Sequence, residues 1–143
     1  EKMCQGVLFG LRMLGVQADF RPKNDVEVDG RKISGTGGTE RDEAFLFQGT
    51  LLVDFDVETM LQALRIPVMK LKDKEIESVK ERVTCLRWEL GHTPGLEEIK
   101  NALKAGFEKA FEIRLVEDGL SRDEENLWKT RQRFTRSPRR PAA

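Results

Sequence analysis

The stretch that decides the fold covers residues 24–56 and reads NDVEVDGRKISGTGGTERDEAFLFQGTLLVDFD. Two runs with alternating apolar residues flank Asp29 and Gly30, a pair that suits the type I′ turn of a β-hairpin. Because side chains alternate between the two faces of a strand, Lys32 and Ser34 are expected to share one face. The residues expected on the core-facing side are Val26, Val28 and Ile33.

A cluster of glycines follows Lys32 in the second half of this hairpin, at Gly35, Gly37 and Gly38. Glycine weakens a strand unless a ligand or a second backbone must come very close. A solvated lysine would not require such neighbours. The combination therefore indicates a small-molecule site on the face that carries Lys32.

The rest of the deciding stretch predicts a loop and a long strand. Residues 39–43 are polar and crowded with charge, so a loop over the site is expected there. Residues 44–55 are rich in Phe, Leu and Val, which favours a central strand. Gly49 in the middle of that strand indicates a β-bulge or a close backbone contact.

Helices are expected on both sides of the deciding stretch. Apolar residues at three- and four-residue steps predict an N-terminal helix that ends at Gly15. Gly6 and Gly10 on this helix would let another backbone approach closely. Asp54 and Asp56 are placed to cap a short helix, which is favoured over metal binding. The further expected elements are helices at 57–64 and 121–134, apolar helical stripes at 76–86 and 96–111, and a short strand at 113–116.

The composition fits one globular domain without a global charge bias. The chain has 143 residues, and its 25 basic and 25 acidic side chains cancel, so no net field steers it toward nucleic acid or an anionic membrane. No segment approaches the roughly 20 apolar residues that span a bilayer, and no signal-peptide layout occurs, which favours a cytoplasmic protein. Residues 1–134 are expected to form the domain. Residues 135–143 are expected to form a disordered basic tail, with phosphate binding as the alternative.

The inventory of reactive side chains restricts the chemistry. His92 is the one histidine, so a catalytic triad or a multi-histidine metal site would depend on that single residue. Neither a Walker loop nor a Rossmann glycine motif occurs. Cys4 and Cys85 are interpreted as buried free thiols, with a disulfide or a nucleophile as the alternatives. What remains is Lys32, which could stabilise charge on the α-phosphate of ATP, and Asp25, which could hold magnesium.

Two runs of this sequence closely resemble the lipoate–protein ligase family. The first is NDVEVDGRKISG at residues 24–35, and the second is GTLLVDFD at residues 49–56. The likeness continues through residues 70–84 and covers most of residues 5–118. It implies the α/β (α+β) fold of biotin ligases and class II synthetases, a mixed sheet flanked by helices, here as the C-terminal half of the catalytic domain. The implied activity has two steps, in which lipoate and ATP give lipoyl-AMP and the acyl group then passes to a lysine of a lipoyl-domain acceptor protein.

The resemblance also implies roles for individual residues. Lys32 matches the family's catalytic lysine, which touches the acyl carboxyl and the α-phosphate. Asn24 and Asp25 match a pair beside the adenylate, with Asp25 at the Mg²⁺ ion. The implied nucleotide-binding residues are Asn24, Asp25, Lys32, Ser34, Gly35 and Thr36, and the implied substrate-binding residues are Lys32, Gly35 and Gly49.

The sequence departs from the family pattern in three places. The family's arginine- and glycine-rich segment, RRxxGGG in outline, binds lipoate and nucleotide, and nothing like it occurs here. A second chain that carries this segment is therefore expected as a partner. The small accessory domain that commonly follows is expected to be absent or separate. Gln48 stands where many relatives have histidine just before Gly49.

Two other functions stay open. Octanoyltransferases of the same superfamily carry the acyl group on a cysteine and need no ATP. In the relatives most similar to this hairpin that thiol lies about where Asn24 is here, and neither Cys4 nor Cys85 fits the position. The third possibility is a half-domain without catalysis that only binds lipoate or a lipoyl domain.

Overall fold

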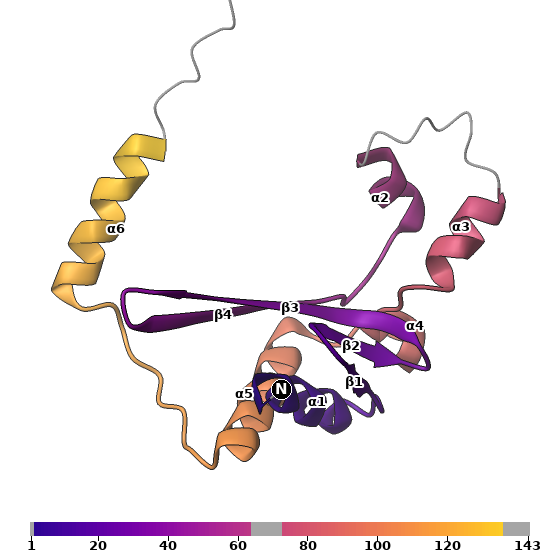
Figure 1. Cartoon of the computed structure of the whole chain (residues 1–143), viewed down its shortest axis with the longest axis horizontal. Helices are drawn as coiled ribbons and strands as arrows, with labels where there is room; N and C mark the ends of the chain where they lie inside the picture. Colours follow the sequence, from indigo (N-terminus) through magenta and orange to yellow (C-terminus); the bar gives the residue numbers. More distant parts are fainter. Residues whose placement is uncertain (1, 64–72, 136–143) are drawn as a thin grey trace, which may run out of the picture.

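The computed structural model describes residues 2–63 and 73–135. One antiparallel sheet with the strand order β1-β2-β3-β4 forms its centre, and helices lie on either side (Figure 1). The strands are β1 (Asp19–Arg21), β2 (Asp25–Val28), β3 (Arg31–Arg41) and β4 (Ala44–Leu51). The helices are α1 (Lys2–Met13), α2 (Val57–Ala63), α3 (Asp73–Lys80), α4 (Leu86–Leu90), α5 (Leu96–Phe111) and α6 (Arg122–Thr135). The expected class, a sheet flanked by helices, is confirmed, and the parallel element of the sheet is an isolated bridge between Lys32 and Val83.

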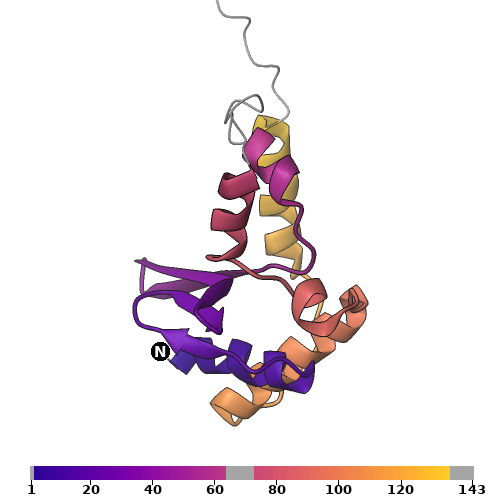
Figure 2. The same ribbon diagram turned by 90° about the vertical axis from the view of Figure 1, so that its right-hand side faces the viewer.

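Helices α1 and α5 pack side by side and cover one face of the sheet (Figure 2). Their apolar stripes and the inward side chains of β2 and β3 form one core, because each amphipathic element must bury its apolar face. On the other side, α2, α3 and α6 project from the two ends of the sheet (Figure 1). The buried core residues are Val7, Leu8, Leu11, Val16, Ala18, Val26, Val28, Ile33, Leu86 and Ile99.

The crossing of α1 and α5 is built on glycines. A Cβ atom on Gly106 of α5 would lie 2.3 Å from the carbonyl oxygen of Gly6 and 2.5 Å from the backbone nitrogen of Gly10. Backbone atoms cannot move aside as the end of a side chain can, so the position requires glycine. The expectation that Gly6 and Gly10 admit another backbone is therefore confirmed.

The predicted β-hairpin is the turn between β2 and β3. Asp29 and Gly30 have φ angles of 48° and 76°, and two positive φ angles are what a type I′ turn requires. Val26, Val28 and Ile33 are buried, as expected. Gly15, with a φ angle of 89°, ends α1 in the left-handed conformation.

The expectation that Lys32 and Ser34 share a face is wrong, because β3 contains a β-bulge. Val26 of β2 pairs with Ser34, yet the next residue, Glu27, pairs with Lys32, so Ile33 is an extra residue in β3. Lys32 therefore lies on the face away from α1 and α5. Ser34 turns toward the helices, where it is buried beside Val7.

The expectations for residues 39–43 and 44–55 are also wrong. Residues 39–41 continue β3, and the β3–β4 connection is a two-residue turn at Asp42 and Glu43, both with positive φ. β4 ends at Leu51 and, among residues 2–63 and 73–135, lies at the end of the sheet rather than at its centre. Its pairing with β3 is regular through Gly49, so the bulge expected there does not occur. Phe, Leu and Val promote a strand without determining its position in the sheet.

The segments outside the sheet agree only in part with the predictions from the sequence. Asp56 caps α2 through the amides of residues 58 and 59, but Asp54 accepts a hydrogen bond from Arg87 instead. A capping box of Ser121 and Glu124 starts α6, the helix expected at 121–134. Residues 113–116 form no strand, and 136–143 of the expected tail lie outside the described residues. Within the described part of the chain, no helix has both the length and the apolar character to cross a bilayer.

Candidate functional site

The centre of the candidate site is an ion pair between neighbouring strands. The Nζ atom of Lys32 on β3 lies 2.6 Å from Oδ1 of Asp25 on β2. The lysine side chain reaches this carboxylate across Gly35, where a Cβ atom would lie 3.0 Å from Cε and 3.1 Å from Nζ of Lys32. Gly35 therefore has a definite function, since it leaves room for Lys32 to lie along the sheet.

A second cation also binds Asp25, and the sequence did not predict it. Arg21 of β1 donates from Nη2 to Oδ2 of Asp25 at 2.5 Å and from Nη1 to Oε1 of Glu27 at 2.9 Å. Two cations and two carboxylates thus alternate on one face of the sheet. The signal available in the sequence was the short turn at 22–24, which places Arg21 directly opposite Asp25 in the antiparallel pair.

These contacts determine the charge state of Asp25. The hydrogen bond from Lys32 lowers the pKa of the Asp25 carboxyl below its ordinary value of 3.8, and Arg21 adds to this effect, while burial opposes it. The carboxylate is consequently charged throughout the neutral range. The Lys32 ammonium and the Arg21 guanidinium are balanced by the carboxylates of Asp25 and Glu27, so an anion would bind here through further N–H donors of Lys32.

We expect replacement of Asp25 by asparagine to reduce the pH dependence of stability in acid. Because the pKa is lower in the folded state, the carboxylate contributes stability above its unfolded pKa, and this contribution is lost as the pH falls through the folded pKa. The wild-type advantage over Asp25→Asn should therefore be full at pH 6 and shrink below about pH 4. Urea unfolding of both proteins across this range measures the difference, and parallel pH profiles would contradict the assignment.

A shallow cavity of about 270 Å³ lies beside the ion pair, over the paired backbones of β3 and β4 and next to Asn24. Its lining includes Asn24, Gly35, Thr36 and Gly49, so four of the predicted site residues come together here. Glycines at 35, 37 and 49 leave backbone exposed, which lets a flat ligand lie against the sheet. Gln48, the residue that departs from the family's histidine, also lines the cavity, as does Thr50.

Thr36 and Ser34 turn their side chains toward the helices rather than into this cavity. Thr36 is buried, and its hydroxyl donates to the Asn24 carbonyl oxygen at 3.0 Å, while its amide donates to the same oxygen at 2.8 Å. Thr36 therefore fixes the turn that carries Asn24. Ser34 lines a different cavity, under β4 and against α5, and is not brought together with Lys32.

The fit of a magnesium ion was tested on the donors present. No group of three His, Cys, Asp or Glu side chains is close enough to form a metal cage within residues 2–63 and 73–135. Asp25 Oδ1 is buried, and within the same residues its polar contact is the Lys32 ammonium. One carboxylate suits Mg²⁺ bound mainly by substrate phosphates and water, and it does not suit a resident metal held by protein alone.

A larger cavity of about 740 Å³ lies elsewhere, between the start of α2, α3 and α4. Asp54, Arg87 and Trp88 contribute to its wall. None of the residues implied by the resemblance lines it, so its size alone does not make it the candidate site.

The match to known proteins agrees with this geometry. The family model of the lipoyl protein ligase A/B catalytic domain matches residues 1–108. The chain belongs to this family. Its members are enzymes, described as lipoate–protein ligases or octanoyltransferases.

Two relatives illustrate this range. Lipoate-protein ligase A subunit 1 of Thermoplasma acidophilum is 31% identical over 137 residues, covering 87% of this chain and 51% of the relative. Octanoyltransferase LipM of Geobacillus kaustophilus is 29% identical over 145 residues, covering 85% of this chain and 52% of the relative. The chain thus spans about half the length of these two ligase-family relatives.

Solved structures extend the likeness to the fold. A bi-partite lipoate protein ligase from Thermoplasma acidophilum, described with its E2 lipoyl domain, matches with a TM-score of 0.75 and 33% identity. A lipoate-protein ligase A bound with ATP matches with a TM-score of 0.70 and 26% identity. Each match covers 94% of this chain, and the chain covers 52% and 53% of those structures respectively. The fold is therefore that of the lipoate ligases.

Proposed function

We propose that this chain supplies one half of the catalytic site of an ATP-dependent lipoate–protein ligase. The observation that carries the proposal is the Lys32 ammonium, which lies across Gly35 beside a cavity floored by backbone, in a chain of the lipoate ligase family. The substrates are lipoate, ATP and a lysine of a lipoyl-domain acceptor protein. The structure of a related ligase bound with ATP supports the nucleotide as a substrate.

The proposed reaction has two balanced steps. In the first, a carboxylate oxygen of lipoate attacks the α-phosphorus of ATP, the bond to the bridging oxygen breaks, and pyrophosphate leaves. In the second, the acceptor lysine amine attacks the acyl carbon, AMP leaves, and the amide forms with loss of a proton. Charge builds on the α-phosphate in the first step. A fixed ammonium beside that phosphate lowers the barrier electrostatically.

Lys32 is suited to this task because an ammonium has three donors. One donor holds Asp25, and the others are available to the acyl carboxylate and the phosphate. Asn24, Gly35, Thr36 and Gly49 shape the cavity beside it. Asp25 would hold Mg²⁺, which neutralises phosphate charge when bound.

The remaining wall of the site is proposed to come from the part of the catalytic domain that relatives contain and this chain lacks. We call the part of the Thermoplasma acidophilum subunit outside the match the complementary half, and this chain joined to it the completed enzyme. The RRxxGGG-type segment is expected there, as a second chain or a separate segment. In that organism the matched half and the complementary half belong to one subunit, and the description of the ligase as bi-partite supports a further partner subunit. The two free cysteines favour the cytoplasm as the compartment.

Octanoyl transfer is the second candidate, favoured by the similarity to LipM. It requires a reactive thiolate, and both cysteines of this chain are buried. Burial raises the pKa of the Cys85 thiol, which makes it a poor nucleophile. Cys4 lies on α1 with Sγ 3.7 Å from the Thr36 hydroxyl, beneath the site rather than in it. A half-domain that only binds lipoate is the non-enzymatic alternative.

The three functions are separated by the mass of a lipoyl domain after incubation. With lipoate and Mg·ATP, we expect the completed enzyme to lipoylate the domain and this chain alone to leave it unmodified, because half of the site is missing. Octanoyl transfer from an octanoyl carrier without ATP, abolished by Cys4→Ser or Cys85→Ser, would favour the transferase. Lipoate binding without any modification would favour the non-enzymatic half, and robust ATP-dependent lipoylation by this chain alone would refute the incomplete site.

A further inference from the structure

The face of the sheet that carries Lys32 also carries two carboxylates within reach of its side chain. In the β2–β3 ladder, Lys32 lies directly opposite Glu27. Residues directly opposite one another share a face, with Cβ atoms about 5 Å apart. Asp25 lies opposite Gly35, and the extra residue Ile33 brings Lys32 to that same face. Lys32 therefore has one acid opposite it and a second acid on the diagonal.

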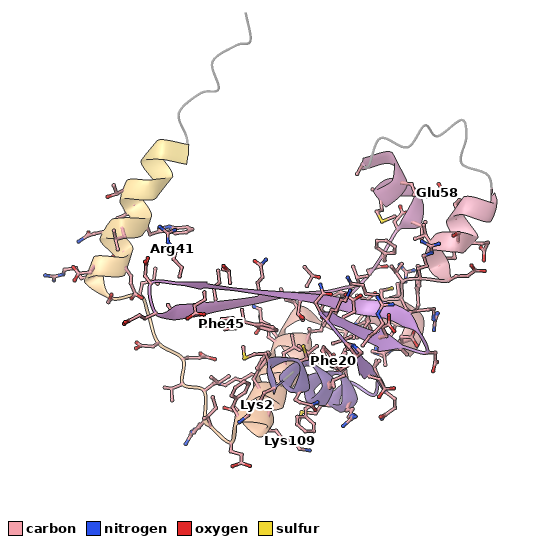
Figure 3. The ribbon with its side chains drawn as sticks, viewed as in Figure 1. Lys2, Phe20, Arg41, Phe45, Glu58 and Lys109 are labelled. Carbon is pink, nitrogen blue, oxygen red and sulfur yellow. The ribbon has the colours of Figure 1, made fainter. Side chains whose placement is uncertain are left out.

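The ion pairs on this face do not follow the direct cross-strand pairing. The Lys32 ammonium contacts Asp25 on the diagonal, at 2.6 Å, although Glu27 is the acid opposite it. Glu27 is bound instead by Arg21 of β1, whose Nη1 lies 2.9 Å from Oε1. Phe20, the residue before Arg21, packs against the core on the side of α1, so Arg21 lies on the same face as Lys32 (Figure 3). Arg21 thus occupies the acid that lies opposite Lys32.

The two acids would direct the Lys32 ammonium to different places. When Lys32 is bound to Asp25, its side chain lies against Gly35, where a Cβ atom would be 3.1 Å from Nζ. Gly35 lines the cavity of the candidate site. Glu27 lines a separate hollow near the β2–β3 turn, together with Gly30. An ammonium paired with Glu27 would therefore turn away from the cavity.

The ion pair with Asp25 does not by itself fix Lys32 at the cavity. The Lys32 side chain is 39% exposed, and ion pairs with this much contact with water contribute little to stability. Asp19 of β1 lies opposite Glu27, and two neighbouring carboxylates attract a cation more strongly than one. Removal of Arg21 would therefore leave Glu27 free to compete with Asp25 for Lys32.

We propose that Arg21 is a positioning residue, which keeps the Lys32 ammonium at the cavity by occupying Glu27. Its second hydrogen bond, to Oδ2 of Asp25, leaves Oδ1 of that carboxylate for Lys32. Arg21 thus acts on the reaction through Lys32. This role deepens the proposed function and rests on it, because Lys32 is the residue proposed to stabilise charge on the α-phosphate.

A double-mutant cycle in the completed enzyme tests this role. Arg21→Ala is expected to lower the rate of lipoyl-AMP formation at saturating lipoate and ATP by about tenfold, because the rate follows the fraction of molecules with Lys32 in place. In a Glu27→Gln background, the same change should cost less than about twofold, since the competing carboxylate is gone. Equal losses in the two backgrounds would overturn the proposal, because Arg21 would then act through Asp25 alone or through strand stability.

Arg87 provides a matched control for this cycle. Its Nη1 lies 3.0 Å from a carboxylate oxygen of Asp54, and its side chain is 58% exposed, against 57% for Arg21. It lines the larger cavity and not the candidate site. Arg87→Ala should therefore retain the full rate. A loss as large as that of Arg21→Ala would show that the effect is not specific to Arg21 and would contradict the proposal.

Crystal structures of the same variants separate the positioning from the chemistry. In Arg21→Ala, the Lys32 Nζ atom is expected within about 4 Å of a Glu27 oxygen, and it should return to Asp25 when Glu27→Gln is added. Lys32 still on Asp25 in Arg21→Ala would overturn the proposal, whatever the rate. If the ammonium moves as expected and no form of the completed enzyme makes lipoyl-AMP, the positioning role is supported and the ligase is contradicted.

Discussion

Replacement of Lys32 by alanine is expected to lower the rate of lipoyl-AMP formation in the completed enzyme by about 10²–10³-fold. The variant removes the positive charge that lies next to Gly35 at the edge of the cavity. Its backbone keeps its bonds to residues 82 and 84, but the buried Asp25 carboxylate loses the Lys32 ammonium, so urea unfolding must accompany the rate measurement to show that the variant is folded. Single-turnover formation of lipoyl-AMP measures the chemical step separately from acyl transfer.

Lys100 provides the matched control for this experiment. Its Nζ lies 2.7 Å from a Glu97 oxygen on the exposed side of α5, so it is also a lysine in an ion pair. Lys100→Ala should retain the full rate. Lys32→Arg keeps the positive charge on a side chain of different shape, so it should recover only part of the rate of lipoyl-AMP formation. If Lys32→Ala is as active as Lys100→Ala, Lys32 is not the catalytic residue.

Replacement of Gly106 by alanine is expected to destabilise the fold by about 3 kcal/mol, at the upper end of the cost of overpacking a core. The added Cβ would lie 2.3 Å from the Gly6 carbonyl oxygen and 2.5 Å from the Gly10 nitrogen, so α1 and α5 must separate. The sign of the change in stability distinguishes a crowded glycine from an exposed one. In an open helix interior, the same substitution stabilises by up to about 1 kcal/mol.

Two further glycines calibrate the effect in urea unfolding. Gly6→Ala places its Cβ against the ring of Phe107, which can shift, so a smaller loss is expected. Gly119→Ala meets no atom within 4 Å and should change stability by less than about 0.5 kcal/mol. Equal stability of the Gly106 and Gly119 variants would show that the helices do not cross as described.

The parts of the fold that depend on local sequence could be predicted. The Asp29-Gly30 turn, the glycine that ends α1 and the Ser121 capping box each follow from the conformational preferences of a few adjacent residues. The α5 stripe follows from helical periodicity. The spacing of Gly6 and Gly10 predicts that another backbone approaches this helix closely. It does not predict that Gly106 of α5 is the residue that does so.

The parts that depend on pairing between distant residues could not be predicted. The bulge at Ile33 moves Ser34 to the face opposite that of Lys32, and no nearby residue type predicts this shift in register. The apolar composition of β4 does not distinguish a central strand from a strand at the end of the sheet. In the candidate site, by contrast, the contact of Arg21 with Asp25 is local, and the short turn at 22–24 was a signal that the prediction did not use. The proposal of lipoate as substrate depends on the family likeness, since a lysine among glycines suits several anionic ligands.

Lipoate-dependent exchange of labelled pyrophosphate into ATP tests the central claim most directly, because it reports the adenylation step and no cysteine-based transfer can produce it. The completed enzyme is predicted to catalyse this exchange only with lipoate present, and to lose it when Lys32 is replaced by alanine. A folded completed enzyme that shows no exchange, yet moves an octanoyl group from a carrier to a lipoyl domain without ATP, would contradict the account.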